Sequence, residues 1–176
     1  MKPNRILLLA LAGLVPALAF GVSPKASSST KNIGRAEVIF LEAEKFTDVR
    51  SSLNDTGDRN GYLDDLRDHV GKLSGEYLPE GQRIQVTFTD IDLAGDFPPV
   101  QSASRDHIRV MKDIYPPRMA FSYRVTDASG AVIKEGKDEL TDRNYLTMAA
   151  FTDRSDPLRS DKVLISDWFR REFGRK

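Results

Sequence analysis

Three carboxylates lie close together in the middle of the chain, at Asp90, Asp92 and Asp96. Carboxylate oxygens are the ligands that hard cations such as Ca²⁺ and Mg²⁺ prefer, so this spacing allows a cation site. Paired carboxylates can also divide acid and base roles when burial and repulsion separate their pKa values. Aspartate at a strand end more often accepts hydrogen bonds from loop amides. The sequence therefore leaves bracing of the backbone, ligand binding and catalysis open, and it favours the first.

Two arginines follow this cluster, Arg109 and Arg118, with the Pro116-Pro117 pair just before the second. A guanidinium forks onto a carboxylate through two parallel hydrogen bonds. We expect Arg118 to pair with an acid of the Asp90 loop and so to fix the fold. In an exposed groove, a carboxylated ligand could take the place of that acid. Arg109 and Arg118 are thus candidates for a structural or ligand-binding cluster with the three aspartates.

The motifs of common enzymes are missing. The chain has no cysteine, which excludes disulfides, thiolate metal sites and cysteine nucleophiles. It contains no Gly-x-Ser-x-Gly elbow and no glycine-rich phosphate loop, and neither His69 nor His107 has a metal-ligating partner at local spacing. Formal net charge is zero, so no basic excess is present to hold a nucleic acid. We therefore assign no catalytic residue, no metal ligand and no cofactor.

Two segments have helical periodicity. In the first, over 62–77, apolar residues recur at spacings of three and four: Leu63, Leu66, Val70, Leu73 and Tyr77. The second, over 161–173, presents a broad apolar face around Trp168, and Ser160 or Asp161 can cap its start. The sequence predicts two main helices.

Strand patterns surround the first helix. Residues 37–43 form a short apolar run, and apolar residues occupy alternate positions from Ile84 to Phe88. The alternation breaks at Asp90 and resumes on the other parity at Ile91. This predicts a β-bulge or a strand end near Thr89-Asp90, because one extra residue reverses the face to which each side chain points.

A hairpin follows later in the chain. Residues 119–125 alternate, the turn residues of 127–130 come next, and 131–140 forms a second extended segment. The order of elements predicts an α+β two-layer sandwich, with a mixed or antiparallel sheet of about four or five strands and two main helices.

The N-terminus has the pattern of a signal peptide. Lys2 and Arg5 precede an uncharged, Leu- and Ala-rich stretch that ends in small residues, and we predict cleavage after Ala19. The apolar run is short for a bilayer span, so an uncleaved anchor is the weaker alternative. We expect a signal peptide over 1–19, a flexible linker over 20–34, and a single domain over 35–176, located in the periplasm without a stable membrane span.

Several short motifs between Ala36 and Phe173 occur together, the most specific being Asp90-Ile91-Asp92-Leu93-Ala94-Gly95 and Pro117-Arg118-Met119. In these motifs the chain resembles the bacterial family called domain of unknown function 3016 (DUF3016). It departs from the expected pattern where Tyr115-Pro116 replaces Trp-Pro. The resemblance implies a small exported protein of a Gram-negative bacterium, and it brings no catalytic residues because no activity is assigned to the family.

Two classes of function follow from these observations. The first is a noncatalytic module that binds another envelope component, protein or polymer, through a sheet edge or the loop from Asp90 to Pro99. The alternative is a metal-dependent binder or hydrolase built on Asp90, Asp92 and Asp96. The missing motifs favour the first.

Overall fold

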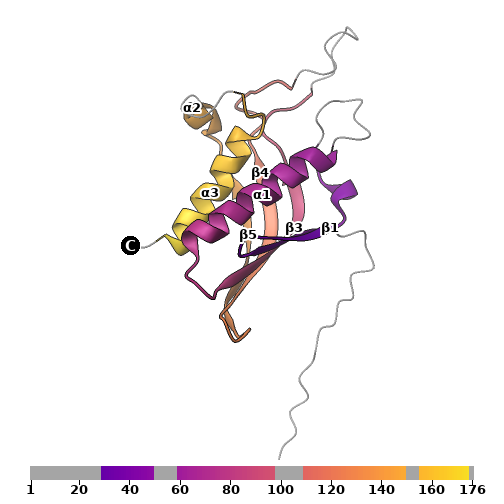
Figure 1. The fold of residues 1–176 in the computed structure, drawn as a ribbon. Coiled ribbons are helices and arrows are strands. Elements are labelled where there is room, and N and C mark those ends of the chain that lie inside the picture. The colour runs from indigo at the N-terminus through magenta and orange to yellow at the C-terminus, as the bar shows by residue number, and fades with distance from the viewer. Residues whose placement is uncertain (1–28, 50–58, 98–108, 150–154, 175–176) are drawn as a thin grey trace, which may run out of the picture.

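The computed structural model describes residues 29–49, 59–97, 109–149 and 155–174. These residues form two layers, a five-stranded sheet and a set of helices that covers one of its faces (Figure 1). The signal peptide predicted over 1–19, its cleavage point and the first part of the predicted linker lie outside the described residues. The predicted α+β fold is confirmed.

The sheet is mixed, and its strands lie in the order β1-β2-β3-β4-β5. Their bounds are β1 Ser29–Ile33, β2 Ala36–Phe40, β3 Arg83–Asp92, β4 Arg118–Thr126 and β5 Val132–Thr141. β2 and β3 are parallel because helix α1 (Arg59–Tyr77) connects them as a crossover, whereas the remaining neighbours are antiparallel. The predicted hairpin is β4 and β5.

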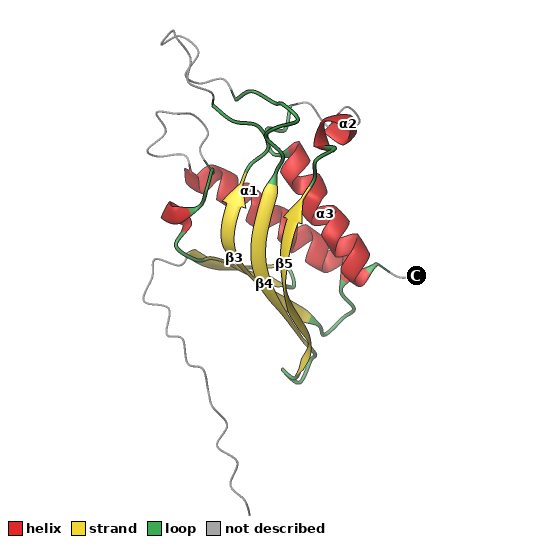
Figure 2. Cartoon of the chain, turned by 180° about the vertical axis from the view of Figure 1, so that it is seen from behind, coloured by secondary structure: helices red, strands yellow, loops and turns green. Residues whose placement is uncertain are grey.

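Helices α1 and α3 (Arg159–Phe173) pack side by side on the covered face of the sheet (Figures 1 and 2). They are the two helices that the sequence predicts, each beginning a little earlier than expected. Two shorter elements, the 3-10 helix η1 (Ala43–Lys45) and helix α2 (Tyr145–Ala149), lie outside this layer. In the part of the chain that is described, no helix has the length and apolar character needed to cross a membrane.

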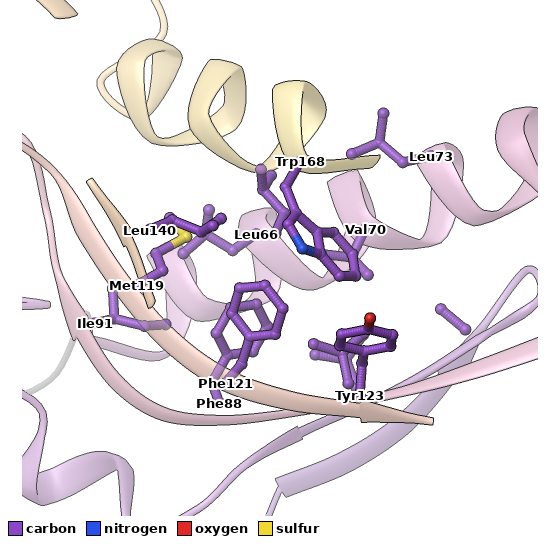
Figure 3. Packing of buried hydrophobic residues seen from close by; sticks show 14 of the residues in the cluster. Leu66, Val70, Leu73, Phe88, Ile91, Met119, Phe121, Tyr123, Leu140 and Trp168 are labelled. Atoms are coloured by element: carbon purple, nitrogen blue, oxygen red, sulfur yellow. The ribbon is translucent and has the colours of Figure 1, made fainter. Parts of the chain in front are cut away.

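Aromatic side chains fill the space between the layers. Phe40, Phe88 and Phe121 lie next to one another on β2, β3 and β4, with ring centroids 5.5 and 5.3 Å apart. Trp168 of α3 meets Phe121 edge-on at 4.9 Å (Figure 3), and its indole N–H donates to Asp138 Oδ2 at 2.7 Å. The buried indole therefore fixes α3 to the sheet and keeps its polar atom bonded.

The predicted bulge lies in β3, where the register with β4 shifts between Phe88 and Asp90. The extra residue returns Ile91 to the covered face, where it is fully buried. Asp92 consequently faces the other side of the sheet, opposite Arg118 of β4. The bulge thus decides which aspartates of the cluster face away from the core.

The linker prediction over 20–34 is wrong for residues 29–33, which form the edge strand β1. The segment has one apolar side chain, Ile33, because an edge strand is held mainly by backbone pairing with its single neighbour. Ile33 packs against Gly71 of α1, where an added Cβ would lie 2.3 Å from its Cγ2 atom. No local periodicity indicates such a contact, so the composition of the segment suggested a linker.

Candidate ligand-binding pocket

Three chain segments meet beyond the C-terminal end of β3, where the loops gather in Figure 2. Asp48, just after η1, continues the parallel pairing with Asp92, and Asp96 forms an antiparallel bridge with Val110. Backbone N–H groups of Asp48 and Leu93 donate to Ile91 and Asp48 carbonyls, both at 3.0 Å. This pairing places side chains from distant parts of the sequence around one cavity.

The cavity has a volume of about 300 Å³, and we call it the acidic pocket. Its charged lining consists of Asp48, Asp92, Asp96 and Arg118. Two of the three aspartates and one arginine of the predicted cluster therefore line a common space. The remaining predicted residues, Asp90 and Arg109, do not line it.

Asp92 is the half-buried carboxylate of the pocket. Burial raises the pKa of Asp92, and the negative charge of Asp48 raises it further, while Arg118 acts in the opposite direction. Burial disfavours the charged form because the carboxylate loses hydration, and a second carboxylate adds repulsion. A cation that enters the pocket would relieve both effects.

Hydrogen bonds with nearby backbone groups hold Asp96 in place. Its Oδ1 atom accepts a hydrogen bond from the Phe97 N–H at 2.7 Å, and its backbone N–H and carbonyl bond to Val110 at 3.1 and 2.8 Å. The side chain is thus oriented before any ligand arrives, which lowers the entropic cost of binding.

Asp90 has the structural role that the sequence favours. Its two carboxylate oxygens accept hydrogen bonds from the Thr47 N–H at 2.7 Å and from the Thr47 hydroxyl at 2.8 Å. These bonds connect β3 to the segment after η1. Asp90 consequently braces the wall of the acidic pocket rather than facing its interior.

Arg109 lies behind the pocket and binds the loop that forms its wall. Its Nη1 atom donates to the Gly95 carbonyl at 2.8 Å and lies 3.0 Å from Asp48 Oδ2, while its guanidinium stacks 4.6 Å from the centre of the Phe97 ring. Both side chains of the Arg109–Asp48 pair are largely buried. Asp48 is not among the site residues that the sequence predicts, because nothing in its local surroundings indicates a partner so distant in the chain.

Asp161 is another carboxylate of this region, and its role differs from the helix cap that the sequence predicts. The sequence predicts Ser160 or Asp161 as the cap of α3, but the helix begins after Leu158 and has no side-chain cap. Asp161 is fully buried instead, and its Oδ1 atom accepts a hydrogen bond from the Ala94 N–H at 3.0 Å. Burial raises the pKa of Asp161 to about 7. Asp161 does not cap α3 because its carboxylate is bonded to the buried Ala94 N–H, a partner 67 residues away in the sequence.

The arrangement does not gather Asp90, Asp92 and Asp96 around one point. Within the described ranges, no group of three or more His, Cys, Asp or Glu residues is placed to hold a metal ion. His69 bonds to the Lys162 carbonyl and the Ser166 hydroxyl, so it joins α1 to α3, and His107 lies outside the described residues. The alternative of a metal-dependent binder or hydrolase gains no support from this geometry.

Comparison with known proteins gives one match. A family described as "Protein of unknown function (DUF3016)" matches residues 34–171. No curated protein and no solved structure matches the chain.

Proposed function

Since this chain belongs to DUF3016, a family of unknown function that matches it over residues 34–171, we propose a role from the pocket itself. The resemblance drawn from short motifs is thereby confirmed, and it supplies no activity. We propose that the protein is a noncatalytic binding module of the bacterial envelope. In this proposal the acidic pocket holds an ammonium group of the protein or polymer that the module binds.

The observation that carries this proposal is the meeting of Asp92 and Asp96 in one cavity. Arg109 already balances the charge of Asp48 from behind, so Asp92 and Asp96 are the carboxylates that a ligand meets, beside the Arg118 guanidinium that also lines the pocket. An ammonium group donates three hydrogen bonds, and such bonds to carboxylates are short and strong. Binding would also reverse the raised pKa of Asp92. The pocket is therefore suited to a primary amine.

A noncatalytic role is supported by the structural partners of the polar side chains around the pocket. Asp90 is bonded to Thr47, and Asp48 to Arg109, so both hold the loops in place. The described lining of the pocket contains no histidine, serine or lysine next to the carboxylates, and its Thr47 hydroxyl donates to Asp90 rather than to Asp92 or Asp96.

Export is supported by the sequence of residues 1–19. The basic start, apolar stretch and small residues before the predicted cleavage point are the features that signal peptidase substrates share. Expression of the full chain in a Gram-negative host followed by fractionation and N-terminal sequencing tests this part. We expect periplasmic protein that starts at Phe20, and cytoplasmic protein with Met1 intact would contradict it.

Amine binding is tested by two-dimensional NMR titration with two kinds of probe. The first is the peptide acetyl-Gly-Lys-Gly-amide, with norleucine in place of lysine as the uncharged control. The second is a glucosamine oligomer, with its N-acetylated form as control. A protein partner predicts shifts with the lysine peptide, and a polymer partner predicts shifts with the amino sugar. Shifts should be centred on Asp92 and Asp96.

Variants make the test specific. Asp92→Asn and Asp96→Asn should each weaken binding about tenfold, because each removes one charge-assisted hydrogen bond. Glu80→Gln is the matched control, since Glu80 is exposed in the turn before β3 and lies outside the pocket. The proposal fails if neither amine binds, or if Glu80→Gln weakens binding as much as the pocket variants do.

A further inference from the structure

The outer edge of β5 is long and accessible. β5 is the last strand in the sheet order, it contains 10 residues, and among the described residues its strand partner is β4 alone. At its start, Val132 and Ile133 are 50% and 49% exposed. An edge of this kind presents unpaired backbone N–H and C=O groups that readily accept another strand. The sequence of β5 indicates which strand that is.

We propose that β5 pairs with β5 of a second copy of this chain, antiparallel and around a two-fold axis at Gly136. Two copies would then share one continuous sheet, with the helices of both on the same face. This inference is independent of the acidic pocket, whose described lining contains no residue of β5.

Charge complementarity around Gly136 is the basis of the proposal. In a two-fold antiparallel pair, residues at equal distances on either side of the axis face each other across the interface. Glu135 then faces Lys137 of the second copy. Lys134 also faces Asp138 of the second copy, but within the chain Lys134 pairs with Glu172 at 2.8 Å and Asp138 accepts the Trp168 bond. The contacts between Glu135 and Lys137 therefore contribute most to the complementarity. Each contact occurs twice by symmetry. Opposite charges directly across a strand pair stabilise it, and like charges destabilise it.

Other positions of the axis lack this complementarity. Outward-pointing backbone groups recur at every second residue, so the competing registers move the axis by one residue at a time. Within Lys134–Glu139, every residue except Gly136 is charged. An axis at any of those residues places a charge opposite its own copy. Axes nearer to either end of the strand pair fewer residues, so Gly136 is the favourable centre.

The pairing begins at Lys134, because β5 is irregular before this residue. Val125 of β4 pairs with Lys134 and Thr126 pairs with Val132, so Ile133 is an extra residue in β5. The regular two-fold register therefore runs from Lys134 to Asp138, centred on Gly136. Lysines on an edge strand commonly protect against unspecific pairing, but in this register Lys137 has an acidic partner, Glu135, in the second copy.

Two contacts within the chain determine how the proposal can be tested. Gly136 lies under the Tyr123 ring, where an added Cβ would come within 2.9 Å of Tyr123 Cε1, so a variant at Gly136 would disturb the core. Glu135 forms an ion pair with Arg124 at 3.3 Å in which both side chains are mostly exposed. Such surface pairs contribute little, so charge changes at 135 and 137 leave the fold intact.

Sedimentation velocity provides the test, with protein purified after expression of the full chain and measured over a range of about 10–500 µM at low salt. We expect a reversible dimer that weakens as salt is added. Glu135→Lys and Lys137→Glu should each raise the dissociation constant at least about tenfold, because each places like charges opposite each other. The double variant, with both changes, should restore the dimer.

The control is Glu76→Lys, which makes the same change of charge at an exposed position of α1, away from the edge. It should leave dimerisation unchanged. The proposal is overturned if the protein is monomeric throughout the range, if the single variants dimerise as well as the wild type, or if the double variant stays as weak as the single ones. Circular dichroism of each variant verifies that the fold is retained.

Discussion

The loop Leu93–Asp96 has carboxylates on both of its sides, and the two sides use them differently. On the buried side, Asp161 accepts a bond from the Ala94 N–H, and Asp48 pairs with Arg109, which also bonds to the Gly95 carbonyl. On the pocket side, Asp92 and the side chain of Asp96 line a cavity of about 300 Å³. The same residue type thus holds the loop on one side and is available to a ligand on the other.

The difference shows that burial and partner decide the role of an aspartate, not its position in a cluster. A buried carboxylate without a donor or a cation is costly, so each buried one is committed to a backbone or guanidinium partner. A carboxylate at a cavity keeps part of its hydration, which a ligand can replace. Stability measurements should therefore respond strongly to changes on the buried side and weakly to changes in the pocket.

The largest effect is expected for Arg109→Ala. It leaves the Asp48 carboxylate, whose side chain is 7% exposed, without its guanidinium partner, and it removes the bond to Gly95. Breaking a buried ion pair in this way costs about 3–5 kcal/mol, measured as the free energy of unfolding in urea. Arg118→Ala is the control on the pocket side, and its effect should stay within about 0.5 kcal/mol. If both variants lower the free energy of unfolding equally, the buried side and the pocket side of the loop do not differ in the way described.

A pH-dependent effect is expected for Asp161. Its pKa is about 7 in the folded protein against the ordinary 3.8, so between these values the folded state holds a proton that the unfolded chain has released. The free energy of unfolding therefore falls as pH rises through this window, by up to about 4 kcal/mol from this group. Asp161→Asn should flatten that slope in urea titrations at pH 4 to about 8.

Asp167→Asn is the matched control for this experiment, because Asp167 lies on the same helix with its side chain 46% exposed. It should leave the slope as in the wild type. A wild-type protein that becomes more stable as pH rises through the same window, with no change in slope in Asp161→Asn, would show that Asp161 is ionised in the folded state.

A smaller loss is expected for Asp90→Ala. This change removes the two hydrogen bonds to Thr47, which are exposed to solvent and contribute about 1–2 kcal/mol together. Thr47→Val removes the hydroxyl bond to Asp90 and keeps the backbone bond. It should therefore lower the free energy of unfolding by about half as much as Asp90→Ala does. If Asp90→Ala has no effect on thermal unfolding, Asp90 does not brace the pocket wall.

The smallest effect, and the only one of opposite sign, is expected for Asp92→Asn. It removes a carboxylate whose pKa is raised by burial and by repulsion from Asp48, so the protein should become more stable by no more than about 0.5 kcal/mol. The same variant loses amine binding in the proposal above. A marked loss of stability, measured in parallel urea titrations, would place Asp92 among the bracing residues.

The spacing of apolar residues along the chain predicted the two helices, the hairpin and the irregularity in β3. The two helices and the hairpin follow from periodicity, and the break in alternation at Asp90 predicted the bulge that turns Asp92 to the open face. Edge strand β1 was missed because its polar residues carry no period, and its pairing depends on the backbone.

The candidate cluster was predicted in part, for a related reason. Asp92 and Arg118 meet because β3 and β4 are antiparallel neighbours. The sequence suggested that Arg118 lies near an acid of the Asp90 loop, but it did not predict the order of the strands. Asp48 and Asp161 reach this region from η1 and α3, and these contacts depend on the packing of both layers. Spacing along the chain contains no information on such contacts, so helix capping was the expected role for Asp161.

The most direct test of this account is a pH titration of the aspartate carboxyl carbons by NMR, with and without acetyl-Gly-Lys-Gly-amide or the glucosamine oligomer. The account predicts that the amine which binds lowers the pKa of Asp92, while the pKa of Asp161 stays unchanged. A bound amine that leaves the pKa of Asp92 unchanged, or that shifts Asp161 instead, would contradict the division between a bracing side and a ligand-binding side of the loop.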